Sequence, residues 1–382
     1  MNFSRILDLP SLLKNRSFFL FGPRATGKTS LIKTQFSTSI PFIDLLDHDY
    51  YLRLLENPKT LKSIVCANDP HAKIAIIDEV QRIPQLLNEV HRLIENDHII
   101  FLLTGSSACK LRRNQANLLG GRARQAELFP LTSQEIPTFD LNRYLHIGGL
   151  PLVYLSQAPW EDLLAYVNVY LKEEIQAEAL VRELPSFIRF LKFSALTSGE
   201  ILNFSNIASD AAVPANTVRE YYRILEDTFI GFLLPAWTKT IKRKPTSKAK
   251  FYYFDIGVKN ALCQIQHIPP KSDVHGKTFE HFIALELRAY LSYRRKNMSF
   301  CYWQEKNGHE VDFIVDDKIA IEVKVTERVQ EKHLKSLRML QEEKICARFI
   351  VVSLDPIKRR EGDIDIMPWQ IFLAQLWGDH IF

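Results

Sequence analysis

The segment Gly22-Pro23-Arg24-Ala25-Thr26-Gly27-Lys28-Thr29 matches the pattern G-x-x-x-x-G-K-[ST] without a gap. The run SFFLFG leads into this segment and SLIKTQF follows it, which predicts a strand, a loop and a helix. In such a loop, glycines let backbone N–H groups turn toward a phosphate, the lysine reaches the β- and γ-phosphates, and the hydroxyl binds Mg²⁺. The sequence therefore predicts a site for ATP and Mg²⁺. Its expected nucleotide contacts are Gly22, Pro23, Arg24, Ala25, Thr26, Gly27, Lys28, Thr29 and Ser30. The alternative is a glycine-containing turn between a strand and a helix that binds no ligand.

A second apolar run supplies the acids that such a site needs. Residues 74–79 read IAIIDE, which predicts a buried strand that ends in Asp78 and Glu79. We expect Asp78 to hold Mg²⁺ together with Thr29, and Glu79 to polarise the water that attacks the nucleotide. GTPases and nucleoside kinases usually lack the second acid, so the pair favours an enzyme that hydrolyses ATP. The alternative is a strand that happens to end in two surface acids.

A third apolar run, HIIFLLTGSS, ends in Thr104 and Ser106. A hydroxyl at this strand end is suited to sensing the γ-phosphate, although hydroxyls are also common at strand ends for turn formation. Beyond it, the stretch GGRAR places Arg122 and Arg124 after a tight turn. Either arginine is a candidate arginine finger that reaches the site of a neighbouring subunit. The alternative is an arginine that solvates the turn or pairs with an acid.

Taken together, these motifs resemble the AAA-type P-loop ATPases of bacteria and archaea whose C-terminal domain of unknown function has a restriction-endonuclease-like core. Gly148-Gly149-Leu150-Pro151 and the run YLKEEI extend the resemblance over nearly the whole chain. The resemblance implies a homo-oligomer in which Arg122 is the preferred candidate for the finger, Ser106 is a candidate sensor, and Asp78 and Glu79 are the acidic pair. A second sensor arginine and an aromatic pore loop are not found, which argues against an unfoldase that threads proteins.

The middle of the chain predicts a helix-turn-helix. Residues 199–234 contain one helix around Ile207, a turn at Val213-Pro214 and a second helix over 216–226. The second helix is expected to bury Val218, Tyr221, Tyr222 and Leu225, and to turn Thr217, Arg219 and Arg223 outward.

A basic stretch follows the helix-turn-helix. Residues 239–250 contain six lysines and arginines and no acid, and we expect them to form the wing of a winged-helix domain. The candidate DNA contacts are Arg219, Arg223, Lys242, Arg243 and Lys244. The alternatives are a structural winged helix used for subunit contact, or a solvated run of charge.

The C-terminal part predicts a cluster of carboxylates. Asp312 lies in the run EVDFIVD, and Glu322 and Lys324 lie two apart in IAIEVKV, hence on one face of a strand. This is the arrangement of PD-(D/E)xK nucleases, in which two carboxylates hold a divalent metal and the lysine stabilises the attacking hydroxide. A preceding helix carries Glu280, which resembles the acid of the first helix in that fold, whereas Glu286 fits less well. The domain is either a metal-dependent DNA nuclease or an inert domain of the same shape.

Length and composition set the frame for these motifs. The chain of 382 residues has 46% hydrophobic and 24% charged residues and a net charge of +5, which excludes a disordered chain and permits a nucleic-acid partner. We expect an α/β chain of three domains: an AAA-type ATPase domain over 1–155, a helical and winged-helix domain over 156–255, and a PD-(D/E)xK-like α/β domain over 256–382.

Five scattered cysteines without a C-x-x-C pair, and an N-terminus without an apolar leader, predict a cytoplasmic protein without a membrane segment. The expected function is Mg²⁺-dependent ATP hydrolysis on or with DNA. The alternatives are a nucleotide-switched binding module and an ATP-regulated nuclease.

Overall fold

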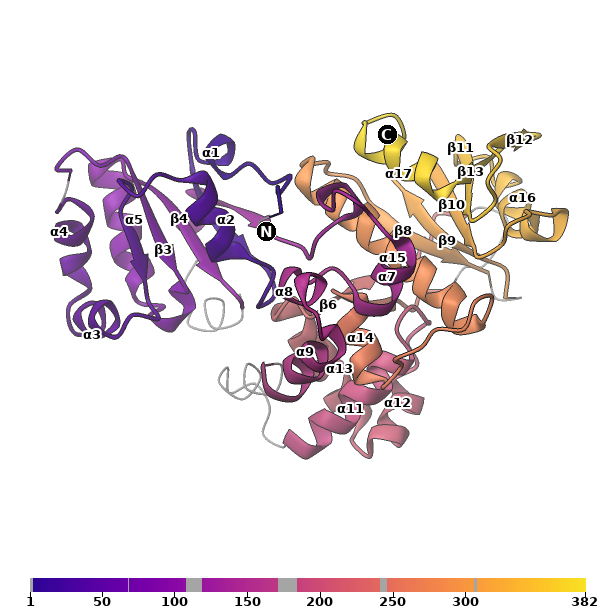
Figure 1. The fold of residues 1–382 in the computed structure, drawn as a ribbon, viewed down its shortest axis with the longest axis horizontal. Coiled ribbons are helices and arrows are strands. Elements are labelled where there is room, and N and C mark those ends of the chain that lie inside the picture. Colours follow the sequence, from indigo (N-terminus) through magenta and orange to yellow (C-terminus); the bar gives the residue numbers. More distant parts are fainter. Residues whose placement is uncertain (1–2, 68, 108–118, 171–183, 241–245, 306–307) are drawn as a thin grey trace.

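The structure is a computed structural model that describes residues 3–67, 69–107, 119–170, 184–240, 246–305 and 308–382. Figure 1 shows two α/β parts at opposite ends of the longest axis and a helical part below and between them. The α/β class with a parallel sheet, which the sequence predicts, is confirmed. Among the helices of the described ranges, none combines the length and the apolar character that crossing a bilayer requires.

The N-terminal part is a parallel five-stranded sheet in the order β2-β3-β4-β1-β5. Its strands are β1 (Ser17–Phe21), β2 (Phe42–Asp44), β3 (Ile74–Asp78), β4 (Ile100–Gly105) and β5 (Ala123–Glu127), and its helices are α1 (Leu9–Leu12), α2 (Lys28–Gln35), α3 (His48–Glu56), α4 (Leu61–Val65) and α5 (Leu86–Asp97). Successive side chains of β1 point to opposite faces, so Phe18 packs in one apolar cluster with Leu31 of α2, and Phe19 packs in another with Leu86 of α5. Both faces are therefore covered. Because β4 lies between β1 and β3, the carboxyl ends of these three strands meet at one edge of the sheet.

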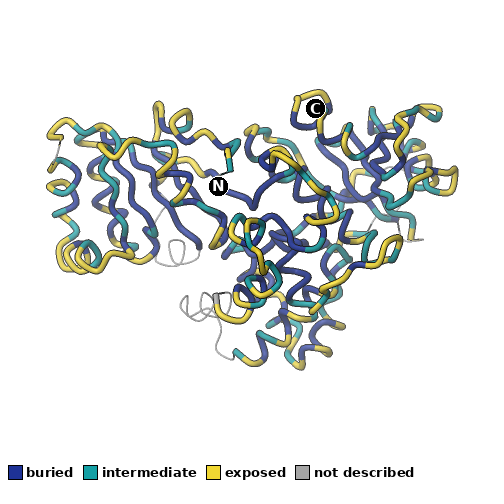
Figure 2. Tube along the Cα trace, viewed as in Figure 1, coloured by how far each residue is buried: buried dark blue, intermediate teal, exposed yellow. Residues whose placement is uncertain are grey.

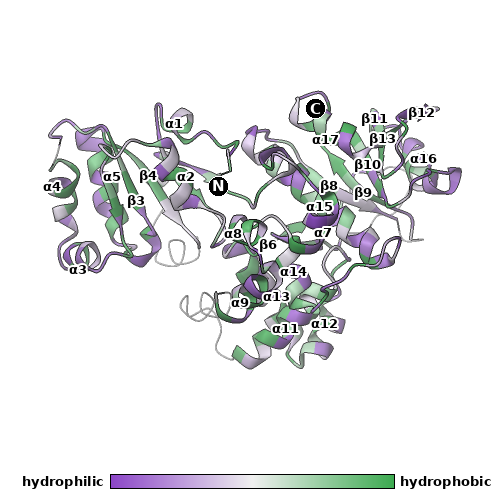
Figure 3. Cartoon of the chain, viewed as in Figure 1, coloured by the Kyte–Doolittle hydropathy of each residue, from purple (hydrophilic) through white to green (hydrophobic). Residues whose placement is uncertain are grey.

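The middle part is mainly helical. Its elements are α7 (Leu141–Ile147), α8 (Pro151–Leu155), α9 (Pro159–Ala165), a π-helical turn (Tyr166–Tyr170), α11 (Leu184–Leu196), α12 (Phe204–Ala211), α13 (Ala215–Asp227), β6 (Gly231–Leu234), β7 (Lys250–Tyr253) and α14 (Ile256–Leu262). The strands β6 and β7 form an antiparallel pair. The helix α14 packs against α7 and α11, so the chain continues to build the helical part beyond residue 255. The hydrophobic faces of these helices are visible in Figure 3.

The C-terminal part is a mixed six-stranded sheet in the order β12-β13-β11-β10-β9-β8. Its elements are α15 (Asp273–Tyr293), β8 (Phe300–Gln304), β9 (Glu310–Val315), β10 (Ile319–Lys324), α16 (Lys335–Gln341), β11 (Arg348–Ser353), β12 (Arg359–Glu361), β13 (Ile364–Pro368) and α17 (Trp369–Trp377). The strands β8, β9 and β10 are antiparallel neighbours, and β10, β11 and β13 are parallel.

The long helix α15 joins the two α/β parts. It packs against β10 and α17 of the C-terminal part, and also against the edge strand β5 of the N-terminal sheet. One apolar cluster runs from Leu20 through Phe282 to Leu376, and Figure 2 shows the buried segments of the two parts continuing toward each other. The ion pair of Arg288 with Glu127, at 2.8 Å, adds a polar contact across the same boundary.

Candidate functional site

The loop between β1 and α2 has the backbone geometry that a phosphate-binding loop needs. Gly22 has a φ of +149°, and a Cβ there would lie 2.4 Å from the carbonyl oxygen of Leu128, so only glycine fits. Gly27 has a φ of +92° and begins α2 without a side-chain cap. The first backbone N–H groups of α2 therefore have no acceptor from a capping side chain, and they carry the positive end of the helix dipole. This arrangement suits a bound anion.

Lys28 lies inside this loop and not on the surface. It is buried, and its Nζ donates hydrogen bonds to the carbonyl oxygens of Gly22 at 2.6 Å and Pro23 at 3.0 Å. The hydroxyl of Thr26 donates to the same Pro23 oxygen, at 2.9 Å. The ammonium group thus closes the loop that surrounds it, and it lies in the place from which it would reach a phosphate at the start of α2.

Hydroxyl and carboxylate groups from three elements meet beside the loop. The Oγ1 of Thr29 donates to Oδ2 of Asp78 at 2.7 Å, and the hydroxyl of Thr104 donates to Oδ1 of the same carboxylate. The second and third strands therefore bring their polar ends together as expected. Thr104 holds the Asp78 carboxylate rather than pointing freely toward a ligand. The oxygen donor set of Thr29 and Asp78 is of the kind that Mg²⁺ prefers.

Glu79 follows Asp78 in an unusual backbone conformation. Its φ of +59° and ψ of +43° lie in the left-handed region, which is uncommon for a residue other than glycine. The side-chain amide of Gln81 donates to the Glu79 carboxylate and also lies 3.2 Å from the hydroxyl of Ser106. Gln81 is buried, and it connects Glu79, which is expected to polarise the attacking water, with Ser106, the expected sensor of the γ-phosphate. No sequence motif points to Gln81, whose only signal is its position two residues after Glu79.

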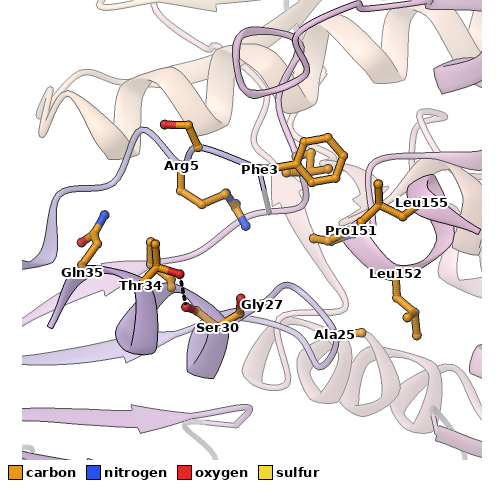
Figure 4. Close-up of a pocket in the computed structure, with 13 residues that line it drawn as sticks. Phe3, Arg5, Ala25, Gly27, Ser30, Thr34, Gln35, Pro151, Leu152 and Leu155 are labelled. Carbon is orange, nitrogen blue, oxygen red and sulfur yellow. Dashed lines mark hydrogen bonds between the residues drawn. The ribbon is translucent and has the colours of Figure 1, made fainter. Parts of the chain in front are cut away.

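Two cavities, each of about 490 Å³, border the loop. One is lined by Lys28, Thr29, Glu79 and Tyr166 among others, and so includes part of the predicted phosphate and metal site. The other lies on the far side of Gly27 and is shown in Figure 4. It is lined by Phe3, Ser4, Arg5, Ala25, Gly27, Ser30, Leu31, Thr34, Gln35, Leu131, Pro151, Leu152 and Leu155. Of the predicted nucleotide contacts, Ala25, Gly27 and Ser30 line both cavities.

Arg5, in the second cavity, ties the loop to the C-terminal part. Its guanidinium donates to the carbonyl oxygens of Thr26 at 2.8 Å and Phe129 at 2.6 Å, and to Glu135 at 2.9 Å. It also lies 3.3 Å from the hydroxyl of Tyr293, on α15. No role for Arg5 was predicted, because the first ten residues contain no recognisable motif.

A second polar cluster lies where α15 crosses β9 and β10. Oδ2 of Asp312 accepts from the backbone N–H of Val323 at 2.7 Å, and Nζ of Lys324 lies 2.5 Å from Oε1 of Glu322. One carboxylate oxygen each from Glu280, Glu310 and Asp312 lies within 4.8 Å of the others. The structure therefore brings together the four residues that the sequence analysis proposed for a nuclease site, and adds Glu310.

Burial controls the charges in this cluster. It raises the pKa of Asp312 well above its ordinary value, with Glu322 and Glu280 adding to the rise. It also raises the pKa of Glu322 to about 7, against the opposing attraction of Lys324. Burial alone would lower the pKa of Lys324, but the attraction of Asp312 and Glu322 outweighs it and raises that pKa. Perturbed pKa values of this kind gather at functional sites, and they also occur in structural ion-pair networks.

Glu286, the alternative acid on α15, lies outside this cluster. Its carboxylate accepts from the backbone N–H of Ser133 at 2.7 Å, from the Ser133 hydroxyl at 2.9 Å and from Nε1 of Trp377 at 2.7 Å. It joins the N-terminal part to α17, and burial raises its pKa to about 7.

The prediction that residues 239–250 form an exposed basic wing is wrong at Lys250. It was expected on an exposed wing, but its side chain is 2% exposed and pairs with Glu310 at 2.5 Å and with Glu280 at 3.1 Å. Lys239 is likewise paired, with Asp317 at 2.5 Å. The absence of acids nearby in the sequence hid these partners, which come from the C-terminal sheet and from α15. The expected contacts Lys242, Arg243 and Lys244 lie outside the described residues, as does most of the run YLKEEI.

Comparison with known proteins divides the chain into three segments. Residues 14–137 match the family described as an AAA domain. This segment is therefore similar to AAA domains. Residues 138–268 match a domain of unknown function, DUF8612, and residues 275–372 match another, DUF4143.

Two relatives are described only as uncharacterized proteins. A protein of Methanocaldococcus jannaschii is 24% identical, over 94% of this chain and 85% of its own length. A protein of Mycobacterium tuberculosis is also 24% identical, over 78% of this chain and 67% of its own length. Among solved structures, the Aeropyrum pernix ORC1 protein in complex with DNA shares 14% identity and covers 65% of this chain and 86% of its own. The TM-score of that match is 0.23.

Within residues 14–137, Arg122 forms a surface contact. It lies just before β5, and its Nε donates to the carboxylate of Glu95 on α5. Arg122 is not among the residues that line the two cavities beside the loop of its own chain. A role in catalysis would therefore have to be played in the site of another subunit.

The motif Gly148-Gly149 lies in the segment that matches DUF8612, where both glycines contact Asp255. The backbone N–H of Gly149 donates to Oδ2 of Asp255 at 2.7 Å, and a Cβ on Gly148 would lie 2.2 Å from Oδ1 of the same residue. Burial raises the pKa of Asp255 to about 6. The two glycines thus make room for a buried carboxylate that also caps α14 through the N–H of Val258.

The same segment contains the two helices expected for a helix-turn-helix. α13 buries the stripe of Val218, Tyr221, Tyr222 and Leu225. Arg219 and Arg223 are exposed on its other side. The guanidinium of Arg219 lies over the ring of Phe204, 5.2 Å from its centroid, and Arg223 is 3.9 Å from Asp227. β6 and β7 follow as an antiparallel pair.

Proposed function

We propose that this protein is a Mg²⁺-dependent ATPase. One observation carries the proposal: the hydroxyl of Thr29 lies 2.7 Å from the Asp78 carboxylate, directly beside the uncapped N-terminus of α2. A hydroxyl, a carboxylate and a ring of backbone N–H groups are the parts that hold a nucleoside triphosphate and its metal ion.

Each residue of this site would have its own part in binding or hydrolysing ATP. The N–H groups of Gly27 and Lys28 bind phosphate oxygens, and the Lys28 ammonium exchanges its carbonyl partners for them. Mg²⁺ held by Thr29 and Asp78 would neutralise charge that develops on the phosphates. Glu79 accepts a proton from the attacking water. Gln81 is hydrogen-bonded to both Glu79 and Ser106 and keeps the Glu79 carboxylate in place. Through these two bonds, a shift of Ser106 at the end of β4 would also shift the Glu79 carboxylate.

The proposal includes assembly into a homo-oligomer in the cytoplasm. Arg122 lies away from the cavities of its own chain, so it would act as a finger in a neighbouring subunit. The apolar side chains of Leu46 and Leu152, which are 65% and 66% exposed, border the nucleotide cavity. A neighbouring subunit seated there would cover them and complete the site.

DNA is the proposed partner. The exposed Arg219 and Arg223 of α13 lie on the side of the helix opposite its buried stripe, which is where a recognition helix presents its side chains to a groove. The basic residues Lys242, Arg243 and Lys244 follow β6 and would contact phosphates without reading sequence.

A second candidate function is metal-dependent cleavage of DNA by the DUF4143 segment. The observation that favours it is the meeting of Glu280, Asp312, Glu322 and Lys324 around one point of the sheet. The remaining alternative is a nucleotide-switched module with slow turnover and an inert C-terminal part.

Phosphate release from ATP by the full chain, with and without duplex DNA, tests the proposal. We expect release that requires Mg²⁺ and rises at least about tenfold with DNA, a change of about 1.4 kcal/mol in barrier. Slow release that ignores DNA would favour the switched module. DNA cleavage in the same samples, followed with Mg²⁺ and with Mn²⁺, would establish the second candidate.

A further inference from the structure

The side chain of Lys250 is the most enclosed cation among the described residues of the C-terminal cluster. It is 2% exposed, whereas the side chain of Lys324 is 36% exposed. Its Nζ lies 2.5 Å from Oε1 of Glu310 and 3.1 Å from Oε1 of Glu280. The ring of Tyr302 lies against the same ammonium, 5.2 Å from its centroid, and shields it from water.

The acids that hold Lys250 are the acids that could hold a metal ion. Oxygens from Glu280, Glu310 and Asp312 lie within 4.8 Å of one another, a spread that one divalent cation spans when its oxygen ligands lie about 2.0–2.6 Å away. Lys250 contacts two of these three carboxylates. The ammonium group and a metal ion would therefore compete for the same oxygens, and their like charges would repel each other.

A neighbouring acid has a free oxygen. Glu322 is 3% exposed, and its Oε2 is a buried atom with no hydrogen-bond partner among the described residues. A buried carboxylate oxygen without a partner is costly, and a cation nearby would remove that cost. When ionised, the four carboxylates carry more charge than the two cations Lys250 and Lys324, and a metal ion would balance the difference.

Lys250 does not belong to the sheet that carries these acids. It is the first residue of β7, where it pairs with Leu234 of β6 and bridges to Ile201. Tyr252, two residues along β7 and on the same face, donates its hydroxyl to Oε1 of Glu280 at 2.5 Å. The strand that extends the helix-turn-helix thus inserts two side chains into the acid cluster of the C-terminal part.

We propose that Lys250 is a built-in cation that closes the C-terminal acid cluster to divalent metal. The cluster of Glu280, Glu310 and Asp312 takes a metal ion only when the Lys250 ammonium leaves these carboxylates. Metal binding there is thereby coupled to the position of the helix-turn-helix segment. The coupling stands whether or not the N-terminal part hydrolyses ATP, and it bears on the second candidate function because a nuclease would need the metal.

Replacing Lys250 with an apolar chain of similar length tests this coupling. Mn²⁺ binding to the full chain, free of nucleotide, is measured by electron paramagnetic resonance for the parent, Lys250→Met and Lys250→Arg, with thermal unfolding of each. We expect Lys250→Met to bind one more Mn²⁺ per chain than the parent, at least about tenfold more tightly at this site. Mn²⁺ should also raise its unfolding temperature. Lys250→Arg keeps a cation and should behave as the parent does.

Further variants make the outcome decisive. Adding Glu310→Gln to Lys250→Met should remove the extra Mn²⁺. A Lys250→Met chain that folds only when Mn²⁺ is present would support the proposal equally, since the metal then replaces the lost charge. A folded Lys250→Met chain that binds no additional Mn²⁺ would overturn it. A Lys250→Met chain that stays unfolded with Mn²⁺, while Lys250→Arg folds, would also overturn the proposal. The same holds for a parent chain that binds Mn²⁺ tightly through Glu310.

Discussion

Thr29 on α2 and Asp78 at the end of β3 are joined by a hydrogen bond of 2.7 Å, although 49 positions separate them in the sequence. The contact is possible because β4 holds β1 and β3 one strand apart, so that both strands end at the same edge. It places a hydroxyl and a carboxylate where one metal ion could contact both, and our account of the nucleotide site depends on it.

Thr29→Ala should therefore weaken ATP binding only when Mg²⁺ is present. Loss of the hydroxyl removes one oxygen from the proposed metal site, and changes around a metal typically cost about ten- to a hundredfold in affinity. Titration calorimetry with ATP, in Mg²⁺ and then in EDTA, measures the difference. Thr34→Ala is the matched control, because Thr34 lies one turn further along α2 and donates to the carbonyl oxygen of Ser30. Equal losses in Mg²⁺ and EDTA would argue against a metal role for Thr29.

Arg122→Ala should abolish hydrolysis and leave ATP affinity nearly intact, because a finger acts on the transition state in another subunit. Mixing it with Glu79→Gln should restore part of the activity, since some sites would then combine an intact acid with an intact finger. Glu95→Gln is the structural control, as it breaks the same surface ion pair and keeps the arginine. If Glu95→Gln lost activity to the same degree, Arg122 would matter only through its pairing with Glu95.

Replacing Lys242, Arg243 and Lys244 together with Ala should weaken DNA binding similarly for every sequence. Each lost phosphate contact should lower the slope of log affinity against log salt by about one unit. Fluorescence anisotropy over a series of salt concentrations measures this slope. The exposed lysines Lys332 and Lys335 with Lys344 provide a triple-Ala control of equal charge. A sequence-selective loss would mean base contacts, and unchanged binding would exclude the segment from the DNA interface.

Glu286→Gln should change how stability depends on pH. Burial raises the pKa of Glu286 to about 7 in the folded chain, so the folded state holds its proton at pH values where the unfolded chain releases it. The stabilisation is complete at low pH and is lost as pH rises from about 4.5 to 7, by about 1 to 3 kcal/mol in total. Urea unfolding across this window should show a fall that is smaller in the variant by this amount, because the buried Asp255 and Glu322 still titrate there in both chains. A parallel pH dependence in both chains would contradict the assignment to Glu286.

The sequence was informative where a residue's role depends on its immediate neighbours. Gly22 through Thr29, the strand ending in Asp78 and the strand ending in Thr104 are each defined by a local pattern, and each forms as predicted. The buried stripe of α13 also follows from its helical period. No local pattern predicts the strand order, which brings Thr29 and Asp78 together.

The sequence misled where a side chain's partner comes from a distant element. Lys250 ends a run of basic residues and so looked exposed, but Glu280 and Glu310 lie 30 and 60 positions further on. Gln81 and Arg5 were missed for the same reason, since an amide or a lone arginine acquires a role only from Ser106, Thr26 or Tyr293 across the fold. Charge and periodicity describe a segment, and they do not identify its tertiary partner.

The most direct test of the central claim is steady-state phosphate release from Mg²⁺-ATP by the parent and by Glu79→Gln, with ATP affinity measured alongside. The amide keeps the size of the side chain and cannot take up the proton, so we expect the variant to bind ATP as the parent does and to release phosphate at least about a hundredfold more slowly. Lys28→Ala should lose ATP binding in addition to phosphate release. The control Glu56→Gln, at an exposed position, should match the parent in both measurements. Phosphate release by Glu79→Gln at the parent's rate would contradict the claim that this site hydrolyses ATP through Glu79.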